Sequence, residues 1–110
     1  MDDVLSVGAD QELLWLRHAV LQNAGFKVFT TMDESDAMAC IRRAECGVLL
    51  VCYSLSVGVR QRLAEAFRRH CSGKRIIAIT NEQMDKADFA DSFVYGIEGP
   101  EALIQSIRAA

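Results

Sequence analysis

Short apolar runs alternate with longer, more polar stretches along the whole chain of 110 residues. Five of the runs have the length of buried strands, and they cover 3–7, 26–31, 47–52, 75–80 and 92–95. The third run reads Gly47-Val48-Leu49-Leu50-Val51-Cys52 and holds no charged position, which is typical of a strand covered on both faces. We therefore predict a sheet with 47–52 at its centre.

The stretches between these runs carry helix signals. The stretch 11–24 follows a capping residue, Asp10, and ends at Gly25, which favours the left-handed conformation that closes helices. Further helices are expected at about 33–44, at 59–71 and from Pro100 onward. The inward positions predicted for the first two helices are Leu13, Leu16, Val20, Leu21, Ala24, Ala37, Met38, Ile41 and Ala44. Arg17 lies inside the first apolar arc, and we expect it to reach the edge of the core or to pair with a carboxylate.

The polar stretch 81–91 joins the fourth and fifth runs. A strand–helix–strand connection needs about ten to twelve residues including its helix, so this stretch allows one or two helical turns or a loop. We therefore expect a shortened fourth helix.

Strands and helices alternate five times, which favours a parallel sheet with right-handed crossovers and helices on both faces. The predicted fold is a three-layer α/β/α sandwich, formed by one domain over 1–110. The first and third strands should be neighbours in its middle, which places Gly8, Ala9 and Asp10 beside Cys52. Ligand and reaction sites of such sheets lie at this carboxyl edge.

The net charge of −3 is mild and names no class of partner. Half of the basic residues fall in one helix and the turn after it, and these are Arg60, Arg62, Arg68, Arg69, Lys74 and Arg75. Only Phe67 stands among them as an aromatic residue, and we do not expect a nucleic-acid partner. The chain begins Met1-Asp2-Asp3 and has no run long enough to span a bilayer, so we expect a cytoplasmic protein without membrane contact.

The four cysteines are expected to be free thiols in that compartment. Cys40, Cys46 and Cys52 recur every six residues, whereas zinc sites pair cysteines two to four residues apart. His70 and Cys71 are adjacent and would point to different faces of a helix. We therefore regard the six-residue spacing as coincidence and expect no metal and no cofactor.

Five segments carry a resemblance when they are taken in their order along the chain: 4–10, 24–28, 47–52, 76–80 and 99–103. Together they resemble the receiver domain of two-component response regulators, and the resemblance covers nearly the whole chain. It implies a flavodoxin-like (CheY-like) fold with strand order 2-1-3-4-5. It also implies a role in bacterial two-component signal transduction, in which receivers take part in a phosphorelay.

The chain departs from that family at the functional positions. An active receiver uses clustered carboxylates to hold Mg²⁺, an aspartate to accept the phosphoryl group, a hydroxyl residue and a lysine. The corresponding residues here are Gly8 and Ala9, with Asp10 just beyond them, then Cys52, Thr80 and Gly96. Phosphoryl transfer depends on positioning and on charge neutralisation, so these groups cannot be omitted. We interpret the chain as a pseudo-receiver with a degenerate pocket, no catalytic residue and no phosphoacceptor.

The leading hypothesis is a signalling module that works through protein contacts. A phosphate-binding glycine loop and a nucleophile–base pair are both missing, so we do not expect an enzyme. The partner would be a signalling kinase, an effector or a second copy of the chain in a homodimer, with Phe93 and Tyr95 contributing to the docking face. The alternative is an atypical receiver that senses a ligand, a redox state or a phosphoryl group through Asp10, Cys52 and Thr80. Cys52 is then a sensing thiol instead of a side chain that fills the pocket.

Overall fold

The computed structural model describes residues 3–81 and 89–109. The strands in this part of the chain are β1 (Asp3–Val7), β2 (Lys27–Thr31), β3 (Val48–Cys52), β4 (Arg75–Thr80) and β5 (Ser92–Tyr95). They form one parallel sheet in the order β2-β1-β3-β4-β5. The predicted strands, their parallel pairing and their order are confirmed.

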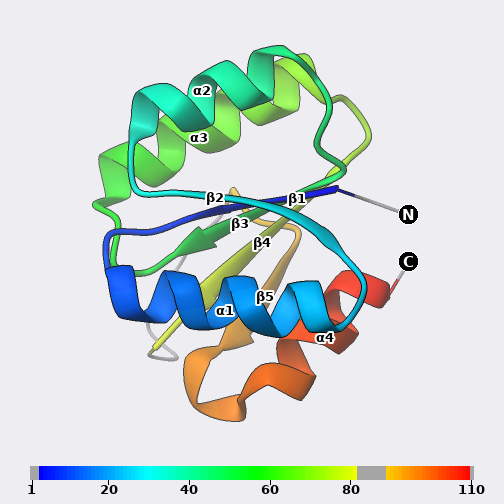
Figure 1. The fold of residues 1–110 in the computed structure, drawn as a ribbon. Coiled ribbons are helices and arrows are strands. Elements are labelled where there is room, and N and C mark those ends of the chain that lie inside the picture. The colour runs from blue at the N-terminus through cyan, green and yellow to red at the C-terminus, as the bar shows by residue number, and fades with distance from the viewer. Residues whose placement is uncertain (1–2, 82–88, 110) are drawn as a thin grey trace.

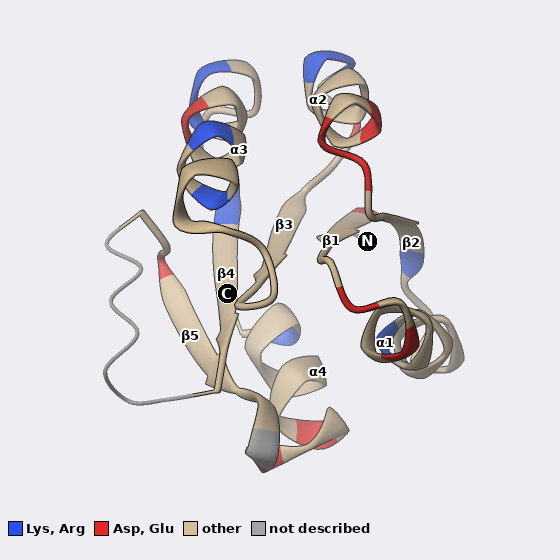
Figure 2. Ribbon diagram, turned by 90° about the vertical axis from the view of Figure 1, so that its left-hand side faces the viewer, with Lys and Arg blue, Asp and Glu red and all other residues tan. Residues whose placement is uncertain are grey.

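The helices lie in two layers, one on each side of the sheet. They are α1 (Gln11–Asn23), α2 (Glu34–Arg42), α3 (Val57–His70) and α4 (Pro100–Arg108), with a short 3₁₀ helix η1 (Gly96–Glu98) before the last. Helices α2 and α3 cover one face of the sheet, and α1 and α4 cover the other (Figures 1 and 2). The three-layer α/β/α sandwich is therefore confirmed.

Strand β3 lies in the middle of the sheet, and every one of its side chains is buried. Leu49 and Val51 join the core beneath α2 and α3, whereas Val48 and Leu50 join the core beneath α1 and α4. Each of these aliphatic side chains stabilises the fold by about 1.5–3 kcal/mol through removal from water. The absence of a polar position in this run thus follows from the two helix layers that cover it.

Capping residues fix where the helices begin. Asp10 precedes α1, and its Oδ1 accepts a hydrogen bond from the Leu13 amide at 3.2 Å, as its place before that helix predicts. Ser56 does the same for α3, since its Oγ accepts from the Val59 amide at 3.3 Å. Helix α3 consequently begins at Val57, two residues before the predicted start.

Two of the predicted inward positions are wrong. Leu16 is 63% exposed, and the residues that α1 buries are Leu14 and Leu21, which lie two turns apart on a neighbouring stripe. Ala44 lies outside α2, exposed and with a φ of +55°, because that helix already ends at Arg42. In both cases a short apolar pattern fixed the presence of a helix but left its rotation or its end undetermined.

The shortened fourth helix was predicted within 81–91, and its greater part, 82–88, lies outside the described residues. Strand β5 then follows from Ser92. In the part of the chain that the structure describes, no helix has the length and apolar content needed to cross a membrane.

Candidate functional site

The end of β1 packs directly against the end of β3 at the carboxyl edge of the sheet. Val7 and Val51 are register partners, so Gly8 comes to lie opposite Cys52. A Cβ placed on Gly8 would lie 3.1 Å from the Cys52 Cβ and 3.1 Å from Leu14 Cδ2. At this point the predicted pocket is filled by protein atoms.

The next two residues of the β1–α1 turn, Ala9 and Asp10, form hydrogen bonds with nearby groups of the protein. The Ala9 amide donates a hydrogen bond to Ser54 Oγ at 2.8 Å, which ties this turn to the one after β3. The exposed Asp10 uses one carboxylate oxygen to cap α1. Asp10 therefore serves the start of a helix.

Arg17 reaches the end of β3 from α1. Its Nη1 donates a hydrogen bond to Cys52 Sγ at 3.1 Å, and Cys52 is only 1% exposed. The sequence led us to expect that Arg17 extends to the edge of the core or meets a carboxylate. It does reach the strand ends, and the acceptor that it meets there is the thiol of Cys52. The sequence did contain a signal for this contact. Arg17 lies among the inward-facing apolar positions of its helix, and from there a long side chain can reach the strand ends.

Thr80 and Gly96 lie on the β4–β5 side of the same edge. Cys52 pairs with Ile79 in the sheet, and Thr80, the next residue, pairs with Tyr95. Thr80 is 1% exposed, and its hydroxyl has no hydrogen-bond partner among the described residues. A Cβ at Gly96 would meet the Thr80 carbonyl oxygen at 3.6 Å, an ordinary contact, so this position has room for a side chain.

Comparison with known proteins identifies structures of the same shape. No protein-family model matches the sequence, and no curated protein matches it significantly. The chemotaxis response regulator CheY4 of Vibrio cholerae matches with a TM-score of 0.84 at 22% identity, over 98% of this chain and 97% of that chain. The receiver domain of the sensor histidine kinase PA1611 from Pseudomonas aeruginosa, solved with magnesium in its active-site cleft, gives 0.82 at 16% identity, over 97% and 94% of the two chains. The fold is the CheY-like flavodoxin fold.

A receiver-domain protein of Methanospirillum hungatei has the same CheY-like fold, with a TM-score of 0.80 at 17% identity over 98% of this chain and 91% of that one. At these identities the comparison extends to the fold, and the chemistry has to be argued from the residues present.

The magnesium ion that active CheY-like receivers use does not fit the residues found here. Gly8 and Ala9 supply no carboxylate, and Asp10 is engaged as a helix cap. The guanidinium of Arg17 adds a positive charge next to Cys52, which opposes a divalent cation. Within residues 3–81 and 89–109, no group of three or more His, Cys, Asp or Glu side chains is arranged to hold a metal ion.

Two of the three regularly spaced cysteines lie in contact, which the spacing did not lead us to expect. The Sγ atoms of Cys40 and Cys46 lie 3.0 Å apart in the core beneath α2 and α3, and both remain free thiols. They meet because α2 ends at Arg42 and the chain turns back at Ala44 towards β3. Burial, followed by the Cys40 thiol beside it, raises the pKa of the Cys46 thiol well above its ordinary value.

We expect Cys40, Cys46 and Cys52 of the native protein to react with iodoacetamide at neutral pH at least about ten-fold more slowly than in urea, because buried thiols are inert. Mass spectrometry of the alkylated peptides measures the rate at each cysteine, and the urea sample is the internal control. If Cys52 reacts much faster than Cys40 and Cys71 in the native protein, the sensing-thiol alternative is correct.

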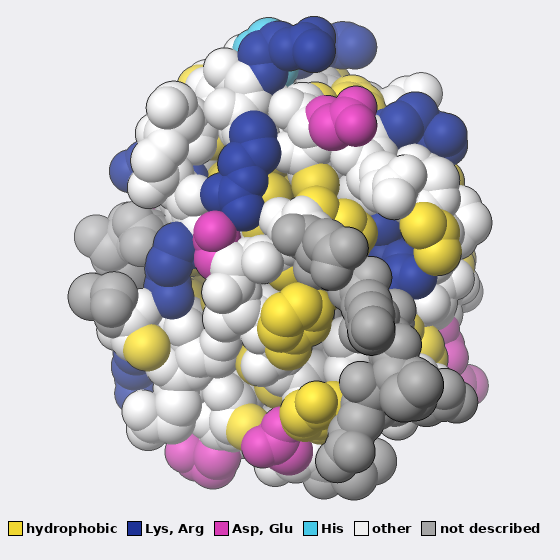
Figure 3. Space-filling view, turned by 180° about the vertical axis from the view of Figure 1, so that it is seen from behind, with side chains coloured by type: hydrophobic (Ala, Val, Ile, Leu, Met, Phe, Trp, Pro, Cys, Tyr) yellow, Lys and Arg dark blue, Asp and Glu magenta, His cyan; other side chains and the backbone are white. Residues whose placement is uncertain are grey.

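Most of the basic side chains of α3 and the following turn form ion pairs or hydrogen bonds with other groups of the protein. Arg62 forms an ion pair with Glu34 at 2.7 Å, and Arg68 forms one with Asp91 at 2.9 Å. Arg75 donates to backbone carbonyls at the end of α4. Figure 3 shows the Lys and Arg side chains of this face spread apart, with acidic and apolar side chains between them.

The exposed large apolar side chains are spread over several elements: Trp15 and Leu16 on α1, Phe29 on β2, Met32 just after it, Val57 on α3 and Phe93 on β5. Trp15 is 51% exposed, and its ring contacts that of His18 edge-on, with the centroids 5.1 Å apart. The His18 Nδ1 in turn lies 2.8 Å from Thr30 Oγ1, which fixes the imidazole against β2. On β5, the edge strand opposite to β2, Phe93 is 45% exposed and Tyr95 is half-buried.

Proposed function

We propose that this protein is a receiver-like signalling module of the bacterial two-component type that works through protein contacts and is not phosphorylated on aspartate. One observation carries the proposal: the residue at the acceptor position is a buried cysteine. The turn at Gly8 packs against it, and Arg17 donates a hydrogen bond to its sulfur. An acyl phosphate needs a carboxylate in an open pocket and a bound cation to offset the charge of the phosphoryl group. The buried thiol of Cys52 in place of a carboxylate, and the absence of carboxylates from Gly8 and Ala9, support the proposal.

The partner in this proposal is a protein, either a signalling kinase, an effector or a second copy of the chain. The exposed aromatic side chains Trp15 and Phe93 support it, because aromatic residues contribute a large share of binding energy at protein interfaces. Tyr95 stands beside Phe93 on the same short strand as a further contributor. The internal pairing of Arg62 and Arg68 leaves little of a continuous basic surface and argues against nucleic acid. We further propose a role in the cytoplasm and no enzymatic activity.

Acetyl phosphate with Mg²⁺ tests the absence of phosphorylation. We expect no mass increase of a phosphoryl group and no hydroxylamine-labile phosphate, because Cys52 is a buried thiol and Gly8 and Ala9 offer no carboxylate to a cation. Intact-protein mass spectrometry is the measurement, and an active receiver treated in parallel is the positive control. Stoichiometric acyl phosphate on any aspartate of this chain would overturn the proposal.

The alternative function is ligand, redox or phosphoryl sensing through Asp10, Cys52 and Thr80. The unpartnered hydroxyl of the buried Thr80 is the observation in its favour. Calorimetric titration with inorganic phosphate and with Mg²⁺ separates the two functions. Saturable heat with either one supports sensing at this edge, and its absence supports the contact module.

A further inference from the structure

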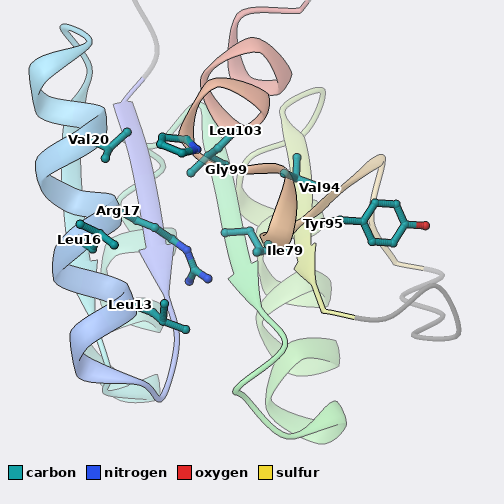
Figure 4. Close-up of a pocket in the computed structure, with 11 residues that line it drawn as sticks. Leu13, Leu16, Arg17, Val20, Ile79, Val94, Tyr95, Gly99 and Leu103 are labelled. Atoms are coloured by element: carbon teal, nitrogen blue, oxygen red, sulfur yellow. The ribbon is translucent and has the colours of Figure 1, made fainter.

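A hollow of about 120 Å³ lies between α1, the end of β5 and the start of α4, on the face of the sheet opposite to α2 and α3. We call it the α1–α4 hollow. Its walls are apolar, formed chiefly by Leu13, Leu16, Val20, Ile79, Val94 and Leu103. Figure 4 shows Leu13, Leu16 and Val20 along α1, with Ile79 and Leu103 across from them and the Tyr95 ring directed away. Since Leu16 is 63% exposed, the hollow is open to solvent along α1.

One cation lies among these apolar walls. Arg17 lines the α1–α4 hollow, and its guanidinium extends from α1 across the space towards the end of β3 (Figure 4). A guanidinium has five N–H donors, yet the acceptor that the structure gives Arg17 is the sulfur of Cys52. Among the described residues no carboxylate lies within ion-pair distance of Arg17. A half-buried cation without a counter-ion is costly, and an anion placed beside it would be stabilised.

The surroundings select the kind of anion. A guanidinium pairs with a carboxylate through two parallel hydrogen bonds, and the single charges cancel. A phosphate carries more charge, and the sites that hold it combine several cations or a nest of backbone amides. The α1–α4 hollow has one basic side chain, and its other side chains are apolar except for Tyr95, whose ring is directed away; the backbone of Gly96 and Gly99 completes the wall. Its chemistry therefore matches a carboxylate that is attached to an apolar body.

We propose that the α1–α4 hollow binds a short aliphatic carboxylate, whose carboxylate pairs with Arg17 and whose chain lies on Leu13, Leu16 and Leu103. This goes beyond the proposed contact function and does not depend on it. The volume of the hollow suits a chain of a few carbon atoms, and hexanoate is the probe chosen. The ligand would enter along the exposed side of α1, past Leu16.

Titration of the intact protein with hexanoate, followed by calorimetry or by amide chemical shifts, tests the proposal. We expect saturable binding with a dissociation constant on the order of 1 mM or below. Hexan-1-ol has the same chain without the charge, and it should bind at least about ten-fold more weakly. Inorganic phosphate has the charge without the chain, and it should not compete with hexanoate. These comparisons use the wild-type protein, so they hold even if a variant fails to fold.

Arg17→Met keeps most of the side-chain volume and removes the charge. It should weaken hexanoate binding by roughly ten- to a hundred-fold, the effect of losing a charge-assisted hydrogen-bonded pair. Arg42→Met is the matched control, because Arg42 is an exposed arginine of α2, on the other face of the sheet. It should bind hexanoate like the wild type.

Several outcomes would overturn the proposal. They are no saturable binding of hexanoate, equal binding of hexan-1-ol, competition by phosphate, or unchanged affinity in Arg17→Met. Unchanged affinity together with self-association of the protein would mean that this apolar surface serves a protein contact. None of these results bears on acetyl phosphate, so a failure here is distinguishable from a failure of the proposed function.

Discussion

Replacing Gly8 by alanine is expected to lower the free energy of unfolding by about 1–3 kcal/mol, the usual cost of adding a methyl group to a filled core. The new Cβ would lie 3.1 Å from both the Cys52 Cβ and Leu14 Cδ2, closer than ordinary van der Waals contact. Gly8 is not among the residues with positive φ, so the loss comes from packing and not from backbone strain. Urea unfolding of the purified variant measures it.

Gly58→Ala is the matched control for this substitution. A Cβ at Gly58 would meet only Arg62 Nη1 at 3.3 Å, the far end of a flexible side chain. Since Gly58 lies in α3, alanine there should leave stability unchanged or raise it by up to about 1 kcal/mol.

Leu14→Ala should itself be destabilising, because Leu14 is fully buried. In the double variant Gly8→Ala/Leu14→Ala the contact with Leu14 is removed and only the contact with Cys52 remains, so the cost should fall below the sum of the two single costs by about 0.5 kcal/mol or more. A Gly8→Ala protein as stable as the wild type would show that the packing around Cys52 is loose.

The crowding at Gly8 bears directly on function. Active receivers carry an acidic side chain in this turn, and here even a single carbon atom would contact two buried side chains. In the pseudo-receiver that we propose, the absence of carboxylates from Gly8 and Ala9 and the crowding at Gly8 therefore go together. Under that proposal, an aspartate in place of Cys52 would still lack room at Gly8 for a second carboxylate.

The fold could be predicted because its signals are local and repeated. Strand β3 contains no polar residue, a pattern that two covering layers require, and the alternation of elements then fixes a parallel sheet. Asp10 and Gly25 mark the ends of α1 through their own conformational preferences, and both act as expected. The neighbouring positions of Gly8 and Cys52 follow from the strand order in the same way.

The contacts at the site could not be predicted, because they depend on the rotation of helices and on side-chain reach. Turning α1 by one residue position puts Leu14 in the place expected for Leu13 and Arg17 in the place expected for Leu16, which brings Arg17 onto Cys52. The meeting of Cys40 with Cys46 depends on where α2 ends, and helix ends are uncertain by one or two residues. The spacing of residues in the sequence determines neither the rotation of α1 nor the residue at which α2 ends.

Asp91→Ala is expected to lower the free energy of unfolding by about 1–3 kcal/mol, because it leaves a buried amide without its acceptor. The Asp91 Oδ2 accepts a hydrogen bond from the Ile76 amide at 2.8 Å, and Ile76 is fully buried at the start of β4. The Asp91 carboxylate also receives two hydrogen bonds from Arg68, at 3.0 and 2.9 Å. This exposed ion pair adds little by itself, so the amide contact dominates the expected loss. Thermal or urea unfolding measures the change.

The dependence on pH identifies the part that the charge of Asp91 plays. The Arg68 hydrogen bonds, and to a lesser degree the Ile76 amide, hold the pKa of the Asp91 carboxyl below its ordinary value of 3.8. A lowered pKa means that this stabilisation is complete well above pH 3.8 and is lost as the pH falls through the folded-state value. Asp91→Asn keeps an oxygen that can accept from the Ile76 amide but carries no charge. It should therefore be more stable than Asp91→Ala at neutral pH, and its disadvantage against the wild type should shrink as the solution is acidified below pH 4. A constant difference between wild type and Asp91→Asn from pH 7 down to acid would contradict the role of the charge, and equal stability of the Asn and Ala variants would contradict the role of the amide contact.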